Sequence, residues 1–204
     1  MLKGGNLFAP LLHVMNQTER PQLRMVWPAH LIDQPPDVIP PHGYTIRTFR
    51  SGDEERFYEI MKLAGWPGWN EDKLKFSLSR ILPSGWFMAI REDTDHIVAS
   101  AMCIHNYTER HPFWGDLGWL ACDPDHTGKG LGYTLSAAVT TRFTSAGYTH
   151  IGLYTEHYRL PAIKSYLKLG YVPLIDHTEA HDLWEEVCHG LHWSFTPERW
   201  LRQW

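Results

Sequence analysis

The chain has 204 residues, of which 43% are hydrophobic and 21% charged, so it is long enough to bury the core of one globular domain. Its net charge of −4 argues against nucleic acid as a partner, and its longest uncharged stretch, residues 4–18, is too short and polar for a membrane span or a signal peptide. The three cysteines, an odd number without CxxC spacing, argue against a disulfide framework, so we expect a cytoplasmic protein.

Residues 1–42 differ from the rest of the chain because prolines interrupt them repeatedly. Proline lacks a backbone N–H and biases the preceding residue away from a helix. We therefore predict an N-terminal arm over residues 1–42, ordered only if it packs on the body or on a partner. One domain is predicted over residues 43–204, with a C-terminal helix and tail at 176–204.

From residue 43 onward, turn residues separate periodic segments. Strands are predicted at residues 44–49, 86–91, 96–107, 117–122, 150–155 and 171–175. Helices are predicted after a capping box at Ser51 and Glu54 up to residue 64, and at residues 71–82, 131–146, 160–169 and 178–188. Short turns between the middle strands favour antiparallel pairing, and the alternation of strands and helices after residue 117 favours crossover connections. The fold class is α/β (or α+β), a mixed sheet covered by helices.

The most informative segment runs from Leu120 to Tyr133, where a strand leads through a tight loop into a helix that opens with Gly130 and Gly132. Each glycine in a helix lowers its stability by about 1 kcal/mol relative to alanine. Two glycines at the start of a helix are explained if a ligand approaches the backbone closely. A helix N-terminus also offers unpaired N–H groups to an anion, and Lys129 adds a positive charge. The pattern indicates a phosphate or diphosphate cradle, and the alternative is a flexible connection with fortuitous glycines. It is neither a GxGxxG nor a P-loop sequence.

The same segment resembles the acyl-CoA-binding motif of the GNAT superfamily of N-acetyltransferases, in which a strand precedes a loop of the form Arg/Gln-x-x-Gly-x-Gly/Ala. Gly130 and Gly132 fit this motif, and Thr127 occupies the Arg/Gln position. Residues 157–171 resemble the second family signature, Asn-x-x-Ala-x-x-x-Tyr-x-x-x-Gly-Phe/Tyr, with Arg159 in place of the asparagine. The matching positions of this signature are Ala162, Tyr166, Gly170 and Tyr171. The resemblance covers residues 43–175.

The resemblance implies a central, mixed, mostly antiparallel sheet flanked by helices, with strand 117–122 splayed from strand 150–155 at the acyl-CoA site. It implies direct transfer of an acetyl group from acetyl-CoA to an amine of a small molecule or peptide, without a metal, and it is compatible with a homodimer. The residues that it implies for cofactor binding are Leu120, Ala121, Cys122, Thr127, Gly128, Lys129, Gly130, Leu131, Gly132, Tyr133, Arg159 and Tyr166.

The resemblance also implies three catalytic tasks. An alkylamine is mostly protonated at pH 7, so a base must remove a proton before attack, and Asp116 and Glu156 are the candidates. The backbone N–H of Cys122 would stabilise the oxyanion, and Tyr166 would protonate the departing thiolate. The Cys122 thiol has no histidine partner at a recognisable spacing, so its side chain is interpreted as strand packing. For the side chains of Asp116, Glu156 and Tyr166 the alternative is a structural role.

In this family the acceptor cleft is lined by the first helix–helix loop and the middle strands, which here are rich in aromatic residues. The predicted acceptor-binding residues are Trp66, Trp69, Tyr107 and Trp119. Aromatic walls suit either an apolar acceptor or an amine held by a cation–π contact. Core packing is the alternative for each ring, and it fits Trp66 and Trp69 least because they lie in a Gly/Pro loop.

Two further hypotheses belong to other functional classes. A non-catalytic acyl-CoA-binding protein would sense acyl-CoA and signal to a partner through the N-terminal arm. The departures at Thr127 and Arg159 favour it slightly, and the retained Tyr166 disfavours it. A metal site around His177 and His181 lacks HExxH or cysteine spacing, and a solvated helix face explains these histidines better.

Overall fold

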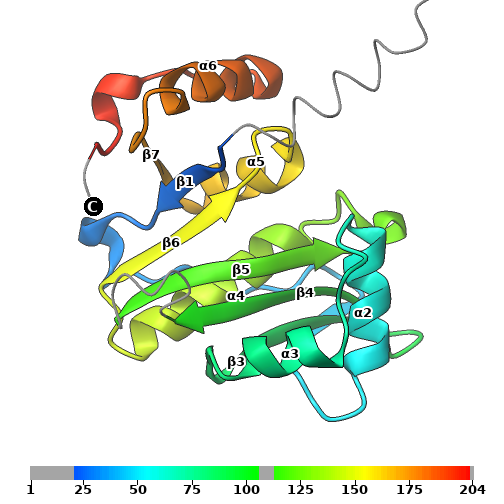
Figure 1. The fold of residues 1–204 in the computed structure, drawn as a ribbon. Coiled ribbons are helices and arrows are strands. Elements are labelled where there is room, and N and C mark those ends of the chain that lie inside the picture. Colours follow the sequence, from blue (N-terminus) through cyan, green and yellow to red (C-terminus); the bar gives the residue numbers. More distant parts are fainter. Residues whose placement is uncertain (1–20, 106–112, 203–204) are drawn as a thin grey trace, which may run out of the picture.

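The computed structural model describes residues 21–105 and 113–202 (Figure 1). Seven strands form one sheet in the order β2-β3-β4-β5-β6-β1-β7, in which the β5–β6 pair is parallel and the other pairs are antiparallel. The strands are β1 (Leu23–Val26), β2 (Tyr44–Thr48), β3 (Ile81–Arg91), β4 (His96–His105), β5 (Trp114–Cys122), β6 (His150–Thr155) and β7 (Val172–Leu174). The helices are α2 (Glu54–Leu63), α3 (Glu71–Leu78), α4 (Leu131–Ser145), α5 (Leu160–Leu169) and α6 (Ala180–Leu191), with 3-10 turns at Ala29–Leu31, Pro124–His126 and Pro197–Arg199.

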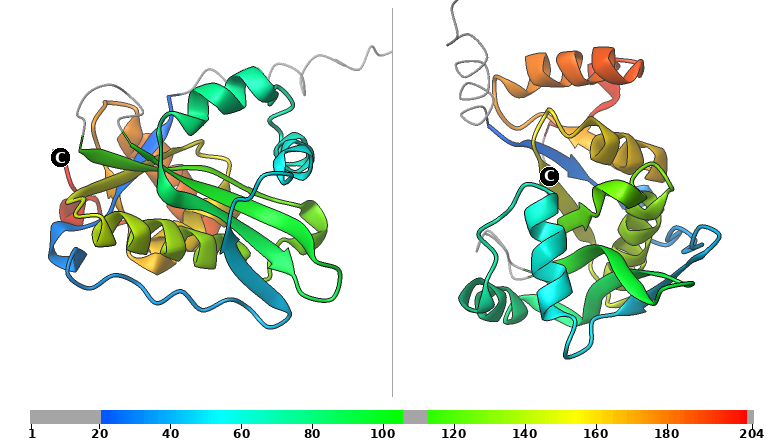
Figure 2. Two further views of the ribbon diagram at one scale, coloured as in Figure 1. Left: turned by 90° about the horizontal axis from the view of Figure 1, so that it is seen from below. Right: turned by 90° about the vertical axis from the view of Figure 1, so that its right-hand side faces the viewer.

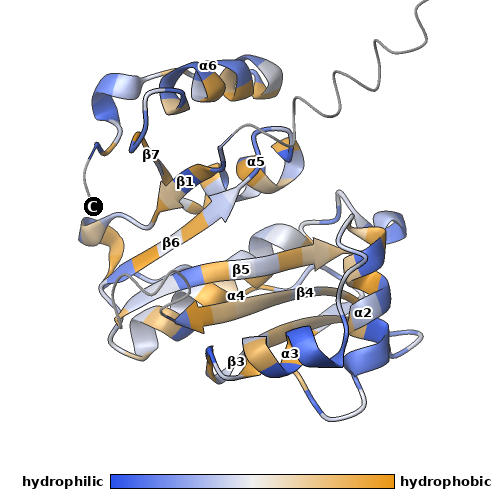
Figure 3. Cartoon of the chain, viewed as in Figure 1, coloured by the Kyte–Doolittle hydropathy of each residue, from blue (hydrophilic) through white to orange (hydrophobic). Residues whose placement is uncertain are grey.

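Helices cover both faces of the sheet. Helix α2 packs on β4 and β5 from one side, whereas α4 packs on β3, β4 and β5 from the other (Figure 2). The core is accordingly divided into two apolar clusters, one around Phe143 under α4 and one around Phe57 under α2. Figure 3 shows much of the apolar colour on the strands and hydrophilic colour on outward-facing parts of α2 and α6. The mixed, mostly antiparallel sheet predicted from the sequence is confirmed.

Residues 1–42 contain a strand that the sequence does not predict. Residues 23–26 form β1, which lies between β6 and β7 and pairs with both, so this segment is a strand inside the sheet. All four side chains of β1 are buried. A run of four residues between prolines and polar residues is too short to show a periodicity, so this segment has no recognisable strand pattern. Residues 27–43 then lead along the molecule to the edge strand β2 (Figure 2).

Most other boundaries agree with the predicted ones within a few residues, and the differences have local causes. Helix α3 ends at Leu78, four residues earlier than predicted, and β3 begins at Ile81 rather than at residue 86. Helix α2 is preceded by Asp53, whose carboxylate accepts the Arg50 N–H and binds Arg47, so the predicted Ser51 cap is replaced by an Asp53 turn.

Within residues 21–105 and 113–202, no helix combines the length and the apolar character that a bilayer crossing requires. The longest, α4, has 15 residues, against about 20 for a membrane span.

Candidate active site

Strands β5 and β6 separate along their length and leave an unpaired backbone edge. Their parallel pairing covers Trp114–Asp116 on β5 and ends where Asp116 meets Gly152. Beyond this point β5 runs on to Cys122 and β6 to Thr155 in diverging directions (Figure 1). The predicted splay of strand 117–122 from strand 150–155 is therefore confirmed, and the β6-facing edge of residues 117–122 is available to an extended ligand.

A β-bulge in β5 lies within the unpaired stretch. Ser100 on β4 pairs with Ala121, whereas Met102, two residues on, pairs with Gly118, so β5 carries one extra residue here. Trp119, inside the bulge, has a φ of +52°, which is unusual for a residue with a side chain. Its ring is packed against Trp66 and Trp69, at centroid distances of 5.7 and 4.9 Å. These aromatic contacts hold the strained position.

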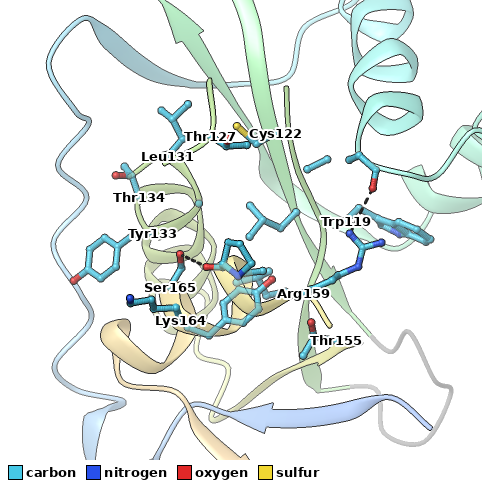
Figure 4. A pocket seen from close by; sticks show the side chains of 18 of the residues that line it. Trp119, Cys122, Thr127, Leu131, Tyr133, Thr134, Thr155, Arg159, Lys164 and Ser165 are labelled. Atoms are coloured by element: carbon cyan, nitrogen blue, oxygen red, sulfur yellow. Dashed lines mark hydrogen bonds between the residues drawn. The ribbon is translucent and has the colours of Figure 1, made fainter. Parts of the chain in front are cut away.

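The separated strands open into a cleft of about 1180 Å³ (Figure 4). Its walls are the unpaired part of β5, the loop before α4, the first turn of α4, the end of β6 and one face of α5. Small-molecule sites usually have about 300–1,000 Å³, so this cleft is large enough for a long ligand. Predicted cofactor-binding residues that line it are Leu120, Ala121, Cys122, Thr127, Gly128, Gly130, Leu131, Gly132, Tyr133, Arg159 and Tyr166.

The glycine-rich loop places the N-terminus of α4 in this cleft. Gly130 precedes the helix with a φ of +88°, a backbone conformation that residues with a Cβ rarely adopt. The first backbone bond of the helix runs from the Thr134 N–H to the Gly130 carbonyl. The N–H groups of residues 131–133 have no intrahelical acceptor and, with the positive end of the helix dipole, could hold an anion.

The side chains of two loop residues are less available to an anion than the sequence predicts. The Thr127 hydroxyl donates to the Pro124 carbonyl at 2.9 Å, so it stabilises the loop itself. Lys129 does not line the cleft, and its ammonium nitrogen lies 5.9 Å from the centroid of the Tyr44 ring. The anion site therefore depends mainly on backbone N–H groups.

Asp116 lies at the point where β5 and β6 part and lines the cleft, although it is only 7% exposed. Burial raises the pKa of this carboxyl group to about 6, and the positive charge of Arg24 on β1 opposes that shift in part. A carboxyl group with such a pKa is mostly ionised at pH 7 and accepts protons more readily than an ordinary aspartate, as a general base requires.

Glu156, the other candidate base, is already engaged by two side chains. Arg159 Nε donates to its carboxylate at 2.6 Å, and Gln22 Nε2 donates to it at 3.1 Å. The Arg159 guanidinium also lies over the Trp66 ring and reaches towards the Ala64 carbonyl after α2. Asp116 is thus the better placed base, and Arg159 faces the α2 side of the cleft rather than the N-terminus of α4.

The two remaining candidate catalytic residues differ in chemistry. Tyr166 on α5 is 5% exposed and lines the cleft, and burial holds the pKa of its phenol well above the ordinary range, so it stays protonated. Burial raises the pKa of the Cys122 thiol to about 11, which leaves almost no thiolate at neutral pH. The interpretation of the Cys122 side chain as strand packing agrees with this value.

The predicted aromatic acceptor wall is only partly present. Trp66 and Trp119 line the cleft. Trp69 does not: it is 6% exposed and packs edge-on against Phe57 and Trp119, so the core-packing alternative is correct for this ring. Tyr107 lies outside the described residues.

The face of Trp66 that could hold an amine is covered by a cation of the chain itself, because Arg159 Cζ lies 3.9 Å from the ring centroid. Other residues of the cleft carried no usable sequence signal. Gln22, Ile39 and Pro41 belong to the predicted arm, and Lys164 and Lys168 are ordinary exposed helix residues in sequence terms.

Among the described residues, no three side chains of His, Cys, Asp or Glu are grouped so that they could hold a metal ion. His181 contacts the Phe195 ring and lies 3.3 Å from Asp182. The metal hypothesis therefore has no geometric support in this part of the chain.

Comparison with known proteins decides the family. The sequence model described as the acetyltransferase (GNAT) family matches residues 49–171, which is more than half of the chain. The chain belongs to the acetyltransferase (GNAT) family. Within the match lie the splayed part of β5, the glycine-rich loop, Asp116 and Tyr166.

Curated relatives that resemble this chain include mycothiol acetyltransferases. The protein from Segniliparus rotundus is 27% identical over 145 residues, which is 67% of this chain and 54% of the relative. The protein from Rhodococcus erythropolis is 27% identical over 176 residues, which is 80% of this chain and 57% of the relative. The chain thus spans about half the length of the curated relatives it matches.

Solved GNAT structures share the fold. A GCN5-related N-acetyltransferase from Sphaerobacter thermophilus aligns with a TM-score of 0.60 at 26% identity, over 80% of this chain and 52% of that one. A phosphinothricin acetyltransferase from Sinorhizobium meliloti, solved with acetyl-CoA, aligns with a TM-score of 0.53 at 20% identity, over 63% of this chain and 74% of that one. The second likeness concerns the fold alone.

GNAT proteins use acetyl-CoA, and the residues of this cleft fit such a ligand. The pantetheine arm is a chain of amides that can pair with an open strand edge, and the cleft offers that edge at residues 117–122. The diphosphate is an anion, and the cleft offers the N–H groups of residues 131–133 next to the left-handed Gly130.

Proposed function

We propose that this GNAT protein transfers an acetyl group from acetyl-CoA to an amine by direct attack. One observation carries the proposal: the open edge of β5, the N-terminus of α4, Asp116 and Tyr166 all face the same cleft. A protein that only binds acyl-CoA needs the open edge of β5 and the N-terminus of α4. An acetyltransferase also needs a proton acceptor and a proton donor at the thioester, and Asp116 and Tyr166 supply these groups.

Binding would use mostly main-chain groups. Acetyl-CoA supplies an activated thioester, which an amine can attack without a covalent enzyme intermediate. The N–H groups of residues 131–133 would hold the diphosphate, and residues 117–122 would hold the pantetheine arm as an added strand. The backbone N–H of Cys122 would stabilise the oxyanion, as the sequence predicts.

Asp116 would act as the general base. As the amine nitrogen attacks the thioester, its protons become acidic, and a carboxylate with a pKa of about 6 can accept one. The buried position of Asp116 keeps it away from competing water. Glu156 would position Arg159 instead, since its carboxylate is held by Arg159 and Gln22.

Tyr166 would donate a hydrogen bond to the departing thiolate. Its phenol stays protonated because burial keeps its pKa above the ordinary value, so the O–H is available to donate at any pH near neutrality. The high pKa also makes full proton transfer unfavourable, and the main contribution of Tyr166 is therefore a hydrogen bond to the developing negative charge.

The acceptor is proposed only as a class, an amine on a small molecule or a peptide. Around the α2 side of the cleft, Asp116 supplies negative charge, whereas the charge of Glu156 is engaged by Arg159, and Trp66 and Trp119 supply apolar surface. This arrangement suits an ammonium group with an apolar neighbour. We further propose a cytoplasmic location, because Cys103, Cys122 and Cys188 are free thiols, and the homodimer stays a prediction.

The non-catalytic alternative predicts acyl-CoA binding without turnover. The test is calorimetric titration with acetyl-CoA and with CoA, followed by release of the CoA thiol in the presence of a panel of amines that includes a mycothiol-related amine. Saturable binding near one per chain with amine-dependent thiol release supports the proposal. Binding without thiol release for any amine supports the non-catalytic alternative, and absence of binding at high micromolar acetyl-CoA overturns both.

A further inference from the structure

Residues 36–41, which we call the strap, lie outside the family-matched region and yet form part of the cleft wall. Ile39 and Pro41 line the cleft together with Gly130 and Tyr133. Figure 4 shows the strap as an extended segment that passes the labelled residues Tyr133 and Thr134. We propose that the strap is a binding element for the nucleotide end of acyl-CoA and acts through Ile39, an inference that rests on the proposed function.

The strap is fixed before any ligand binds. The Thr134 hydroxyl donates to the Ile39 carbonyl at 3.1 Å, and the Thr141 hydroxyl donates to the Pro36 carbonyl at 2.8 Å. These two threonines are seven residues apart on α4 and therefore lie on the same face of the helix, two turns from each other. Pro41 accepts the Tyr44 N–H at 3.0 Å, and the prolines of the strap limit its freedom. A rigid element loses little entropy when a ligand covers it.

Two neighbouring strap side chains have different surroundings. Ile39 lines the cleft and is 73% exposed, whereas Val38 lines a smaller hollow with Ile46 and Phe87 and is 37% exposed. Successive side chains of an extended segment point in opposite directions, which explains the division. Ile39 and the partly exposed Tyr133 together give this end of the cleft an apolar surface.

Positive charge lies on the same side of the cleft. Lys164 and Lys168 are one turn apart on α5, line the cleft, and form no ion pair within the described part of the chain. Figure 4 shows Lys164 extending to the side of the cleft where Tyr133 lies. An aliphatic side chain, a phenol ring and two ammonium groups match a nucleotide, because its base has apolar faces and its phosphate is an anion.

The order of the subsites points to the same ligand part. If residues 117–122 hold the pantetheine arm and the N–H groups of residues 131–133 hold the diphosphate, the nucleotide continues past the N-terminus of α4. The strap and Lys164 line the cleft there. The opposite, α2 side carries Asp116 and Arg159 and remains for the acceptor.

The experiment compares two ligands by calorimetry on the full chain: CoA, and 4′-phosphopantetheine, which ends at the first phosphate and lacks the nucleotide. We expect Ile39→Ser to raise the Kd of CoA about fivefold, as partial loss of a buried aliphatic contact would, and to leave the Kd of 4′-phosphopantetheine within about twofold. The matched control is Val38→Ser, a neighbouring β-branched residue of the strap that faces away, and it should leave both Kd values within about twofold.

Three outcomes overturn the inference. If Ile39→Ser changes both Kd values equally, or changes neither, the strap does not contact the nucleotide, although CoA binding by the unsubstituted chain leaves the proposed function standing. If the unsubstituted chain binds neither ligand, the proposed function fails and the strap proposal fails with it. A thermal unfolding scan of each variant shows whether the chain still folds, and Ile39 is exposed enough that its replacement should leave the transition unchanged.

Discussion

The guanidinium carbon of Arg159 lies 3.9 Å from the centroid of the Trp66 ring, and its Nε donates to Glu156 at 2.6 Å. The contact with Trp66 connects the start of α5 to the loop after α2, and the contact with Glu156 holds the guanidinium in place. The sequence predicts Arg159 as a cofactor contact because it replaces the asparagine of the second family signature. In the structure the Trp66 ring and the Glu156 carboxylate already contact its guanidinium. We therefore expect Arg159 to contribute to the acceptor-binding side of the cleft.

Replacement of Arg159 by glutamine should therefore affect the binding of the acceptor more than the binding of CoA. We expect the Kd of CoA, measured by calorimetry, to change less than about threefold, while the KM of the acceptor rises. The free energy of unfolding should fall by about 1 kcal/mol, because a partly exposed ion pair and a cation–π contact are lost. Arg159→Lys, which keeps the charge near Glu156, is the control. A tenfold loss of CoA affinity in Arg159→Gln would show instead that this side chain reaches a phosphate.

Asp116 should make the stability of the protein depend on pH. Its pKa is about 6 in the folded chain, above the ordinary value of 3.8, so the folded state holds the proton more tightly than the unfolded state does. The contribution of Asp116 to the free energy of unfolding is therefore most favourable below about pH 4, and it decreases as the pH rises to about 6. The loss amounts to about 3 kcal/mol. Asp116→Asn should remove this cost, and denaturant titrations should show a gain of about 1–3 kcal/mol at pH 7.5 and a much smaller gain at pH 4.5.

The same substitution should lower activity. A general base contributes about 10²–10⁴-fold, so Asp116→Asn should reduce kcat/KM by at least about a hundredfold. In the unsubstituted chain kcat/KM should rise with pH through about 6. Glu156→Gln serves as the control and should have a smaller effect. Retention of the pH profile in Asp116→Asn would exclude this residue as the base.

The part of the site that the sequence predicts is the part set by local backbone rules. Glycines at positions 130 and 132 before an apolar helical stripe specify an exposed helix N-terminus, and the structure has it. The sequence does not predict β1, because four residues are too few to show an alternating hydrophobic pattern and the strand is buried by its neighbours β6 and β7. Trp69 does not line the cleft, because it packs on the Phe57 ring, a partner that its position in a Gly/Pro loop does not reveal. Long-range contacts of this kind have no local sequence signal.

Tyr166 and Tyr171 offer a comparison of two buried phenols at a ring-centroid distance of 6.2 Å. Tyr166 lines the cleft, whereas the Tyr171 hydroxyl forms a 2.8 Å hydrogen bond with Thr140 and does not line it. Tyr166→Phe should lower kcat about 10- to 100-fold with the Kd of CoA within about twofold, because the lost hydrogen bond acts on the departing thiolate. Tyr171→Phe should lower the free energy of unfolding by about 1 kcal/mol and leave kcat nearly unchanged. Equal kcat values for the two variants would contradict the assignment of Tyr166.

The glycines at positions 130 and 132 should respond differently to alanine. Gly130 has a φ of +88°, so Gly130→Ala should cost about 1–2 kcal/mol of stability. At Gly132 an added Cβ would lie 3.7 Å from Ser165 Oγ and 3.8 Å from Leu120 Cδ2, which are ordinary contacts, and alanine favours the helix by up to about 1 kcal/mol.

Gly132→Ala should therefore leave the Tm unchanged or raise it, and yet weaken CoA binding, because the new methyl group stands in the cleft where the diphosphate must approach the backbone. We expect the Kd of CoA to rise at least about tenfold in calorimetry, a loss of about 1.4 kcal/mol. Gly147→Ala, at the far end of α4 and with no atom near the added Cβ, tests a left-handed glycine away from the cleft. It should lose stability as Gly130→Ala does and keep the CoA affinity. Unchanged CoA binding in Gly132→Ala would mean that the ligand does not lie on the N-terminus of α4.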